Sequence, residues 1–204
     1  MRTATPTPPA ARAPTPAPVP HPWQLRRART VIHGGGVLAY PTEAVFGLGC
    51  DPLNPAAVRR VLALKGRAPA KGLILIAADF SQLAPFLQPI GRALQARVGA
   101  TWPGPVTWLL PARPWVPGLL RGAHDCLAVR VTAHPAARAL CLAAGGALVS
   151  TSANPAGRPP ARTALAVRRW FGAEVDYVLA GRCGGRARPT EIRDGRSGRV
   201  VRPG

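Results

Sequence analysis

The sequence predicts an α/β or α+β domain built on a largely buried, mixed β-sheet. Apolar runs of strand length alternate with segments of helical apolar spacing from residue 23 onward, and this alternation is typical of that fold class. A length of 204 residues suits one packed domain. We therefore expect a single domain over residues 23–204.

Residues 1–22 differ from the remainder in composition. Pro, Ala and Thr dominate this segment, which also holds two arginines. Such a segment buries too little apolar surface to offset the entropy lost on ordering. We expect a disordered, partly polyproline-like tail, and favour it over an organellar transit peptide because the prolines prevent an amphipathic helix.

Helices are predicted where helical apolar spacing is bounded by capping residues. The first follows Trp23 and stops at Gly34, the first of three consecutive glycines. The second has Asn54 as its N-cap and Pro55 in its first turn, and it runs to Lys65. The other predicted helices are residues 79–87, 90–98, 135–144 (closed by Gly145 and Gly146) and 162–171.

Strands are predicted where short apolar runs lack helical spacing. The run "LILIA", residues 73–77, is continuously apolar, which indicates a strand covered on both faces. The remaining predicted strands are residues 37–40, 106–112, 127–131 and 147–151.

The charge balance is strongly basic. Lys and Arg number 27 against 8 acidic residues, giving a formal charge of +19, and the first acidic residue is Glu43. This excess predicts a polyanionic partner, either a nucleic acid or a phosphorylated small molecule. The alternative is that many arginines are solvated surface groups reflecting compositional bias.

Cysteine spacing and hydropathy restrict the compartment and the metal chemistry. The four cysteines form no C-x-x-C pair and have no histidine at zinc-ligand spacing, so we expect reduced thiols and no protein-ligated metal. No apolar run approaches the roughly 20 residues of a membrane span, and no signal-peptide layout is present. A cytoplasmic protein is therefore predicted.

Common catalytic and nucleotide-binding motifs are absent from the sequence. It contains no G-x-x-x-x-G-K-[ST] loop, no G-x-G-x-x-G before a helix and no G-x-S-x-G elbow. Its four histidines have no partner pattern, and a structural role is favoured for each. The sequence therefore supports neither a Walker ATPase nor a dinucleotide-binding fold, and it lacks the nucleophile elbow of an α/β-hydrolase.

Polar clusters instead follow the apolar strands, where ligands bind in open α/β sheets. Thr42 and Glu43 follow the strand at 37–40, and three cations, Lys65, Arg67 and Lys71, precede the strand at 73–77. A lysine point charge and a two-pronged arginine donor suit a triphosphate.

Two further strands carry polar groups. The segment "LVSTSAN" delivers Ser150, Thr151, Ser152 and Asn154, which fit either a nucleotide or a turn with local capping bonds. Arg130 lies within an apolar strand, so it requires either a substrate carboxylate or a structural acidic partner.

Six ordered blocks together resemble the threonylcarbamoyl-AMP synthase family in its short, single-domain TsaC (YrdC-like) form. The blocks are "AYPTEAVFGLGCD", "LKGRAPAKGLILIAADFSQL", "TWPGPVTWLLPA", "LAVRVTAHP", "LVSTSANPAGRPPART" and "RPTEIRDGRSGRVVRPG". The resemblance implies a twisted, mixed α/β sheet enclosing a basic cavity. It also implies conversion of L-threonine, bicarbonate and ATP to threonylcarbamoyladenylate and pyrophosphate.

The resemblance also implies roles for individual residues. The family's K-x-R and S-x-N elements fall on Lys65, Arg67, Ser152 and Asn154, as catalytic nucleotide contacts. Its threonine-site elements fall on Thr42, Arg130 and Thr190. We add Lys71, Ser150 and Arg202 as substrate-binding residues.

Other implied properties concern the metal ion and the partners. Mg²⁺ is expected to be held mainly by ATP phosphates and water rather than by protein ligands. The product is expected to pass to a separate tRNA threonylcarbamoyl-transferase complex, with weak direct tRNA binding by this protein. The alternative function is a non-catalytic module that binds double-stranded RNA or tRNA.

Some positions differ from the family pattern. Ala44 and Phe46 stand where the family often has threonine and tyrosine, and Ala156 stands where a serine is common. These differences affect fine contacts rather than the predicted activity. The role of Glu43 stays open between tuning Mg²⁺, pairing with an arginine of the phosphate cluster and capping a turn.

Overall fold

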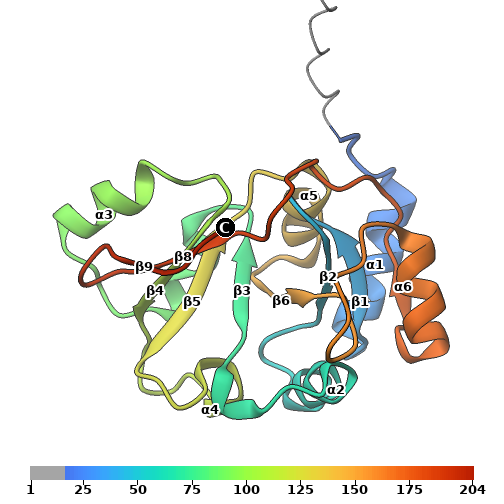
Figure 1. Cartoon of the computed structure of the whole chain (residues 1–204), viewed down its shortest axis with the longest axis horizontal. Helices are drawn as coiled ribbons and strands as arrows, with labels where there is room; N and C mark the ends of the chain where they lie inside the picture. The colour runs from blue at the N-terminus through green and yellow to red at the C-terminus, as the bar shows by residue number, and fades with distance from the viewer. Residues whose placement is uncertain (1–16) are drawn as a thin grey trace, which may run out of the picture.

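A computed structural model describes residues 17–204 of the protein. Its strands join in the order β7-β1-β2-β6-β3-β5-β4-β8-β9 (Figure 1). The sheet contains both parallel pairs, such as β3 with β5, and antiparallel pairs, such as β3 with β6, which confirms the predicted mixed sheet. The strands are β1 (Leu38–Pro41), β2 (Phe46–Gly49), β3 (Ile74–Ala77), β4 (Val106–Pro111), β5 (Cys126–Val131), β6 (Leu148–Ser152), β7 (Tyr177–Val178), β8 (Glu191–Asp194) and β9 (Val200–Arg202).

Helices cover the sheet at its faces and ends. In Figure 1, α1 and α5 lie together behind the sheet, α6 flanks β1, and α3 lies beyond β4. No helix over residues 17–204 is long and apolar enough to cross a bilayer. The α-helices are α1 (Pro22–His33), α2 (Pro55–Lys65), α3 (Arg92–Gly99), α4 (Gly118–Arg121), α5 (Pro135–Ala144) and α6 (Ala164–Phe171). Short 3-10 turns are η1 (Pro69–Lys71), η2 (Phe80–Gln82), η3 (Ala84–Phe86) and η4 (Gly172–Glu174).

The central strand β3 is covered on both faces, as its continuous apolar sequence predicts. Leu75 and Ile76 are both fully buried. Leu75 belongs to the core cluster with Trp108 from β4, whereas Ile76 belongs to the cluster with Leu140 from α5. Successive side chains of a strand point to opposite faces, so β3 separates two apolar cores.

Capping residues end the helices where the sequence predicts. The Asn54 side chain accepts a hydrogen bond from the Ala57 amide at 3.0 Å and begins α2, and Gly66 ends α2 in the left-handed conformation with φ of 54°. Gly145, with φ of 80°, closes α5 after Ala144. Glycine adopts such φ values without the steric cost that a Cβ imposes.

The helix predicted at residues 79–87 is wrong. Two 3-10 turns, η2 and η3, occupy this segment, and Asp79 caps the first through the Ser81 amide at 2.9 Å. Pro85 has no amide hydrogen to donate to the carbonyl of Ser81, four residues earlier, so an α-helical pattern is interrupted. The remaining predicted helices are present, with boundaries shifted by at most two residues.

The predicted N-terminal tail lies largely outside the described residues, because residues 1–16 are not described. Residues 17–21 have no regular secondary structure before α1 begins at Pro22, and the His21 side chain caps α1. The division into a tail over 1–22 and a domain over 23–204 stays a prediction.

The cap of α2 matters because this helix ends at Lys65. We predict that Asn54→Ala lowers the free energy of unfolding by about 1 kcal/mol, since the Ala57 amide loses its acceptor. Asn54→Asp keeps an acceptor at this position and should have a much smaller effect. Urea denaturation of both variants measures the difference, and an equal loss in both would contradict the capping role.

Candidate functional site

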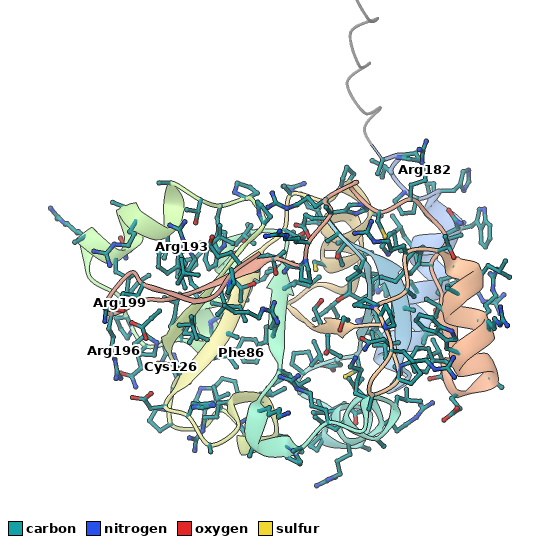
Figure 2. The ribbon with its side chains drawn as sticks, in the orientation of Figure 1. Phe86, Cys126, Arg182, Arg193, Arg196 and Arg199 are labelled. Atoms are coloured by element: carbon teal, nitrogen blue, oxygen red, sulfur yellow. The ribbon has the colours of Figure 1, made fainter. Side chains whose placement is uncertain are left out.

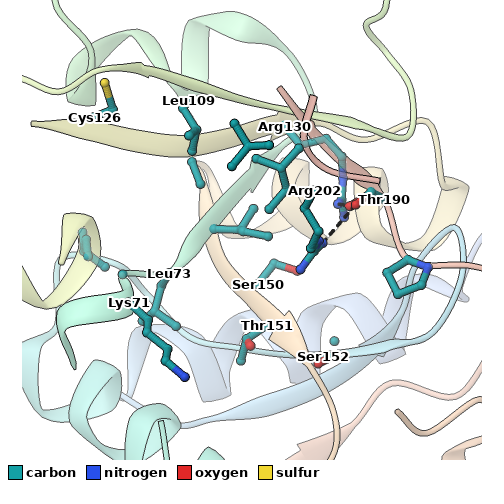
Figure 3. Close-up of a pocket in the computed structure, with 18 of the residues that line it drawn as sticks. Lys71, Leu73, Leu109, Cys126, Arg130, Ser150, Thr151, Ser152, Thr190 and Arg202 are labelled. Carbon is teal, nitrogen blue, oxygen red and sulfur yellow. Dashed lines mark hydrogen bonds between the residues drawn. The ribbon is translucent and has the colours of Figure 1, made fainter. Parts of the chain in front are cut away.

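A basic cavity of about 440 Å³ opens along one side of the sheet, within the size range of small-molecule sites. Figure 3 shows β6 contributing Ser150, Thr151 and Ser152, opposite Arg130 and Arg202. The predicted site residues that line the cavity are Thr42, Lys71, Arg67, Arg130, Ser150, Ser152, Thr190 and Arg202. Lys65 and Asn154 are not part of the lining.

Sheet register explains why residues distant in sequence meet at this cavity. Ser152 of β6 lies opposite Gly47 of β2, and Ser150 lies opposite Ile74 of β3. The turn between β1 and β2 brings Thr42 to the same end, and its backbone amide donates to the carbonyl of Val45 at 3.1 Å. The cavity therefore depends on β6 lying between β2 and β3.

Lys65 lies behind the cavity wall and holds the S-x-N segment. Its Nζ donates to Asn154 Oδ1 at 2.5 Å, to the Asn154 carbonyl at 2.8 Å and to Ser152 Oγ at 3.4 Å. Ser152 Oγ also donates to Asn154 Oδ1 at 2.7 Å. Three of the four residues predicted as nucleotide contacts thus form one hydrogen-bonded group, with Ser152 facing the cavity.

Arg67 and Lys71 are brought together by the loop around η1. Arg67 donates through Nε to the carbonyl of Gly72 at 2.9 Å and through Nη2 to the carbonyl of Lys71 at 3.3 Å. Burial lowers the pKa of Arg67, which indicates that its charge is partly removed from water. The loop therefore holds two cations on one wall of the cavity.

Arg130 has the structural acidic partner that the sequence left open. Its Nη2 lies 3.4 Å from Glu43 Oε2, both side chains are almost completely buried, and its Nη1 donates to Thr190 Oγ1 at 2.8 Å. Of the three roles considered for Glu43, pairing with an arginine is the one found, but that arginine is Arg130 rather than one from the phosphate cluster. Glu43 is not among the lining residues.

The electrostatics of Glu43 support an ionised pair. Burial is the largest influence and opposes ionisation, but the Arg130 charge and a hydrogen bond from Thr132 together outweigh it. The pKa of Glu43 therefore lies below its ordinary value. Glu43 Oε2 and Arg130 Nε have no hydrogen-bond partner among the residues that the structure describes.

Arg202 completes the concentration of positive charge. Its Nη2 donates to the carbonyl of Thr190 at 2.9 Å, and Figure 3 shows Arg130 and Arg202 converging on Thr190. Burial, then the charges of Arg130 and Arg67, lowers the pKa of Arg202. Neighbouring like charges repel one another unless an anion lies between them. The arrangement therefore favours a multiply charged anionic ligand.

Sequence reasoning missed the residues at the far end of the cavity. Arg196, in the turn of the β8–β9 hairpin, forms an ion pair with Asp125, and Arg121 and Asp194 also line this end. Figure 2 shows Arg193, Arg196 and Arg199 spread along the hairpin, with Cys126 of β5 below Arg196. The glycines in "DGRSG" indicate a turn, but they do not indicate which strand the turn approaches.

The structure also shows where the three residues that differ from the family pattern lie. Ala44 and Phe46 are both among the lining residues, but the Phe46 ring packs in the core cluster with Val167 and Phe171 of α6, so a hydroxyl group on that ring would not have faced a ligand. Ala156 lies close to Gly66, at the end of α2. Among residues 17–204, no group of three or more His, Cys, Asp or Glu side chains is placed to hold a metal ion.

A mixed sheet whose strand ends direct several arginines and hydroxyl groups into one cavity defines an α/β protein with a site for an anionic small molecule. The profile of the Sua5/YciO/YrdC family, described as telomere recombination, matches residues 30–204. The chain belongs to this family.

Individual relatives agree with this membership. A threonylcarbamoyl-AMP synthase of Nitrosococcus oceani is 62% identical over 180 residues, covering 88% of this chain and 97% of the relative. The corresponding protein of Halorhodospira halophila is 58% identical over 181 residues, covering 89% and 95%. The structure of P. abyssi Sua5 complexed with L-threonine has a TM-score of 0.78 at 32% identity, covering 84% of this chain and 51% of that one. This chain thus spans about half the length of that protein.

The buried position of Lys65 predicts an unusual titration. Burial, then the charge of Arg67, lowers the pKa of Lys65 from 10.5 to about 8. In the unfolded chain Lys65 keeps its proton up to a pH of about 10.5, whereas in the folded protein it loses the proton near pH 8. The charged form of Lys65 therefore weakens folding at neutral pH, and the free energy of unfolding rises as the pH increases from about 8 to about 10.5. Above about pH 8 the site also loses one positive charge.

Lys65 and Lys71 are the two lysines of the chain, so carbon-13 labelling of lysine gives a simple spectrum. We predict that the Lys65 side-chain resonance, assigned with a Lys71→Arg variant, titrates with a midpoint of about 8. A midpoint at the ordinary value of 10.5 would contradict the effect of burial and of the Arg67 charge on Lys65.

Proposed function

We propose that this chain is a threonylcarbamoyl-AMP synthase, an enzyme of the nucleotidyltransferase type. It converts L-threonine, bicarbonate and ATP to L-threonylcarbamoyladenylate and pyrophosphate, for the biosynthesis of threonylcarbamoyladenosine in tRNA. The observation that carries this proposal is a single cavity with Arg67 and Lys71 on one wall and Thr42, Arg130 and Thr190 on another. Family membership and the names of the relatives support it.

The nucleotide side of the cavity provides charge and orientation. Arg67 and Lys71 neutralise the triphosphate and the charge that develops on the departing pyrophosphate. Ser152 faces the nucleotide, while Lys65 fixes Ser152 and Asn154 through the hydrogen bonds described above. Arg202 lies between this side and Arg130, since it donates to the Thr190 carbonyl and, after burial, the charges of Arg130 and Arg67 both lower its pKa.

The threonine side carries less net charge, because Glu43 pairs with Arg130. Thr42 Oγ1 donates to the carbonyl of Val45 at 2.7 Å, so this oxygen retains its acceptor capacity toward a substrate donor. Arg130 and Thr190 face the same space and suit the carboxylate and hydroxyl of threonine. Discrimination against serine depends on one methyl group, which is worth about 1–3 kcal/mol in an apolar pocket.

The chemistry requires positioning rather than a protein nucleophile. The neutral amine of threonine attacks the carbon of bicarbonate, and loss of water gives a carbamate. A carbamate oxygen then attacks the α-phosphorus of ATP in line, the bond to the β-phosphate oxygen breaks, and pyrophosphate leaves. Holding charged reactants in this geometry supplies most of the acceleration that such transfers need.

Mg²⁺ enters this proposal as part of the MgATP substrate. The two carboxylates of the lining, Asp125 and Asp194, already engage Arg196 and Ser197 respectively, whereas the hydroxyl groups of Ser150 and Thr151 remain at the cavity. This donor set suits an ion held mainly by phosphate oxygens and water, which Mg²⁺ accepts. The ion would offset phosphate charge during the transfer.

The product adenylate is a reactive mixed anhydride, and we expect a separate tRNA-modifying transferase to consume it. We place this hand-over in the cytoplasm and add weak tRNA binding through phosphate contacts. A purely RNA-binding function is less well supported, because RNA platforms stack bases on exposed aromatic rings. Trp108, on the β4 strand of this sheet, is instead fully buried, and the exposed rings of Trp23, Phe80 and Trp115 lie on α1, η2 and a loop rather than on a strand.

The substrate requirement is the direct test of the activity. Purified protein with MgATP should release pyrophosphate only when both L-threonine and bicarbonate are present, because the nucleophile is the carbamate formed from them. Each amino acid in turn serves as the control for threonine. Release without bicarbonate, or no release in any mixture, would exclude the proposed reaction.

Arg67 offers a test of the nucleotide side. We predict that Arg67→Ala lowers kcat by about 100-fold or more, because a charge contact in the transition state is lost. Arg59→Ala, an exposed arginine on α2 that does not line the cavity, is the matched control and should keep full activity. Near-normal turnover of Arg67→Ala would remove this residue from the site.

A further inference from the structure

Glu43 is a buried acid in a strongly basic cavity region, although it does not line the cavity itself. Its Oε1 accepts hydrogen bonds from Thr132 Oγ1 at 2.7 Å and from the Ala133 amide at 3.3 Å. These two donors fix the carboxylate against the end of β5. The other oxygen, Oε2, is thereby directed at the guanidinium of Arg130, 3.4 Å away.

Arg130 is consequently held between two partners. Its Nη2 faces Glu43, and its Nη1 donates to Thr190 Oγ1 at 2.8 Å and to Thr107 Oγ1 at 3.5 Å. The guanidinium is planar and its five donors have fixed relative directions. Fixing Nη1 and Nη2 therefore also fixes the direction of Nε, the one nitrogen without a partner in the described structure.

The charge of Glu43 acts on one side of the cavity only. Arg67 and Arg202 have backbone carbonyls as hydrogen-bond acceptors, whereas Arg130 has a carboxylate. Glu43 therefore offsets the charge of Arg130 and leaves the nucleotide side strongly positive. Without that carboxylate, Arg130 would carry an unpaired buried charge, which is costly and would loosen the placement of its guanidinium beside Thr190.

The backbone around Glu43 couples it to the threonine side. Thr42, its neighbour, lines the cavity, and the carbonyls of Thr42 and Glu43 accept hydrogen bonds from the amides of Gly184 and Arg186 at 3.0 and 3.2 Å. A Cβ added at Gly184 would lie 2.9 Å from the Glu43 carbonyl oxygen, so the segment leading to Thr190 approaches this turn closely. The turn between β1 and β2 therefore fixes the positions of both Thr42 and Glu43, the partner of Arg130.

We propose that Glu43 is a positioning residue for L-threonine, which acts through Arg130 by holding its guanidinium beside Thr190. This inference rests on the proposed function and extends it to a residue that contacts no substrate. It separates the two halves of the cavity: Glu43 governs threonine affinity and has little influence on ATP affinity.

The test is the Glu43→Gln variant, which keeps the size and the Oε1 acceptor but removes the charge. The Michaelis constant for threonine is expected to rise about tenfold or more, because the buried Arg130 loses the opposite charge that holds it. The Michaelis constant for ATP should change by less than about twofold, the spread usual for independent sites. Isothermal titration with L-threonine checks the affinity independently of turnover.

A matched control and a conservative variant separate positioning from folding. Asp176→Asn removes another carboxylate paired with an arginine, Arg60, at a residue outside the cavity lining, and both Michaelis constants should stay unchanged. Glu43→Asp retains the charge and should recover part of the lost threonine affinity. A merely structural Glu43 would lower the unfolding temperature and the active fraction in Glu43→Gln without moving either constant.

Thr132→Val supplies the test if Glu43→Gln does not fold, because it removes the 2.7 Å hydrogen bond to Oε1 and leaves the charge in place. The Michaelis constant for threonine should also rise in Thr132→Val, but by less than in Glu43→Gln. An unchanged threonine constant in the folded variant, or an equal rise for ATP, would overturn the inference. Wild-type protein that failed to release pyrophosphate would instead overturn the proposed function, and the inference with it.

Discussion

The structure depends on a concentration of positive charge that the fold holds in one cavity. Burial, then the charges of Arg130 and Arg67, lowers the pKa of Arg202. Of these arginines, only Arg130 has its charge offset by Glu43. Such repulsion opposes folding, so other interactions must hold the side chains in place. Backbone carbonyls do this for Arg67 and Arg202. The cavity is therefore poised to gain free energy when a multiply charged anion enters.

The sheet provides the rigidity that this arrangement requires. Strand β3 is buried on both faces and anchors the loop that holds Arg67 and Lys71. Strands β5 and β6 lie on either side of it and contribute Arg130 and Ser152. The hairpin of β8 and β9 then closes the far side with Arg202 and Arg196. Charged groups thus come from strands that are distant in sequence but hydrogen-bonded neighbours in the sheet.

Local features of the chain were predictable from its sequence, whereas long-range pairing was not. Asn54 and Gly145 mark helix ends by their own conformational preferences, and the apolar run of β3 indicates burial on both faces. The short strands β2, β7, β8 and β9 lack such signals, since their pairing depends on partners elsewhere in the chain. The partnership of Glu43 with Arg130 was missed for the same reason: 87 positions separate the two residues in the sequence. The resemblance supplied the candidate residues, and the roles of those residues in catalysis stay predictions.

The change in the thermal unfolding midpoint on adding tripolyphosphate tests most directly whether the cavity binds a triphosphate. At about 100 times its dissociation constant, a ligand that binds only the folded state stabilises it by about 2.7 kcal/mol. For a domain of this size, each kcal/mol raises the midpoint by about 2–4 °C, so a rise of about 5–10 °C is predicted. The rise should be largely lost when Arg67 and Arg202 are both replaced by glutamine. No rise, or an equal rise with sodium chloride at matched ionic strength, would contradict the claim that the cavity is built for a triphosphate.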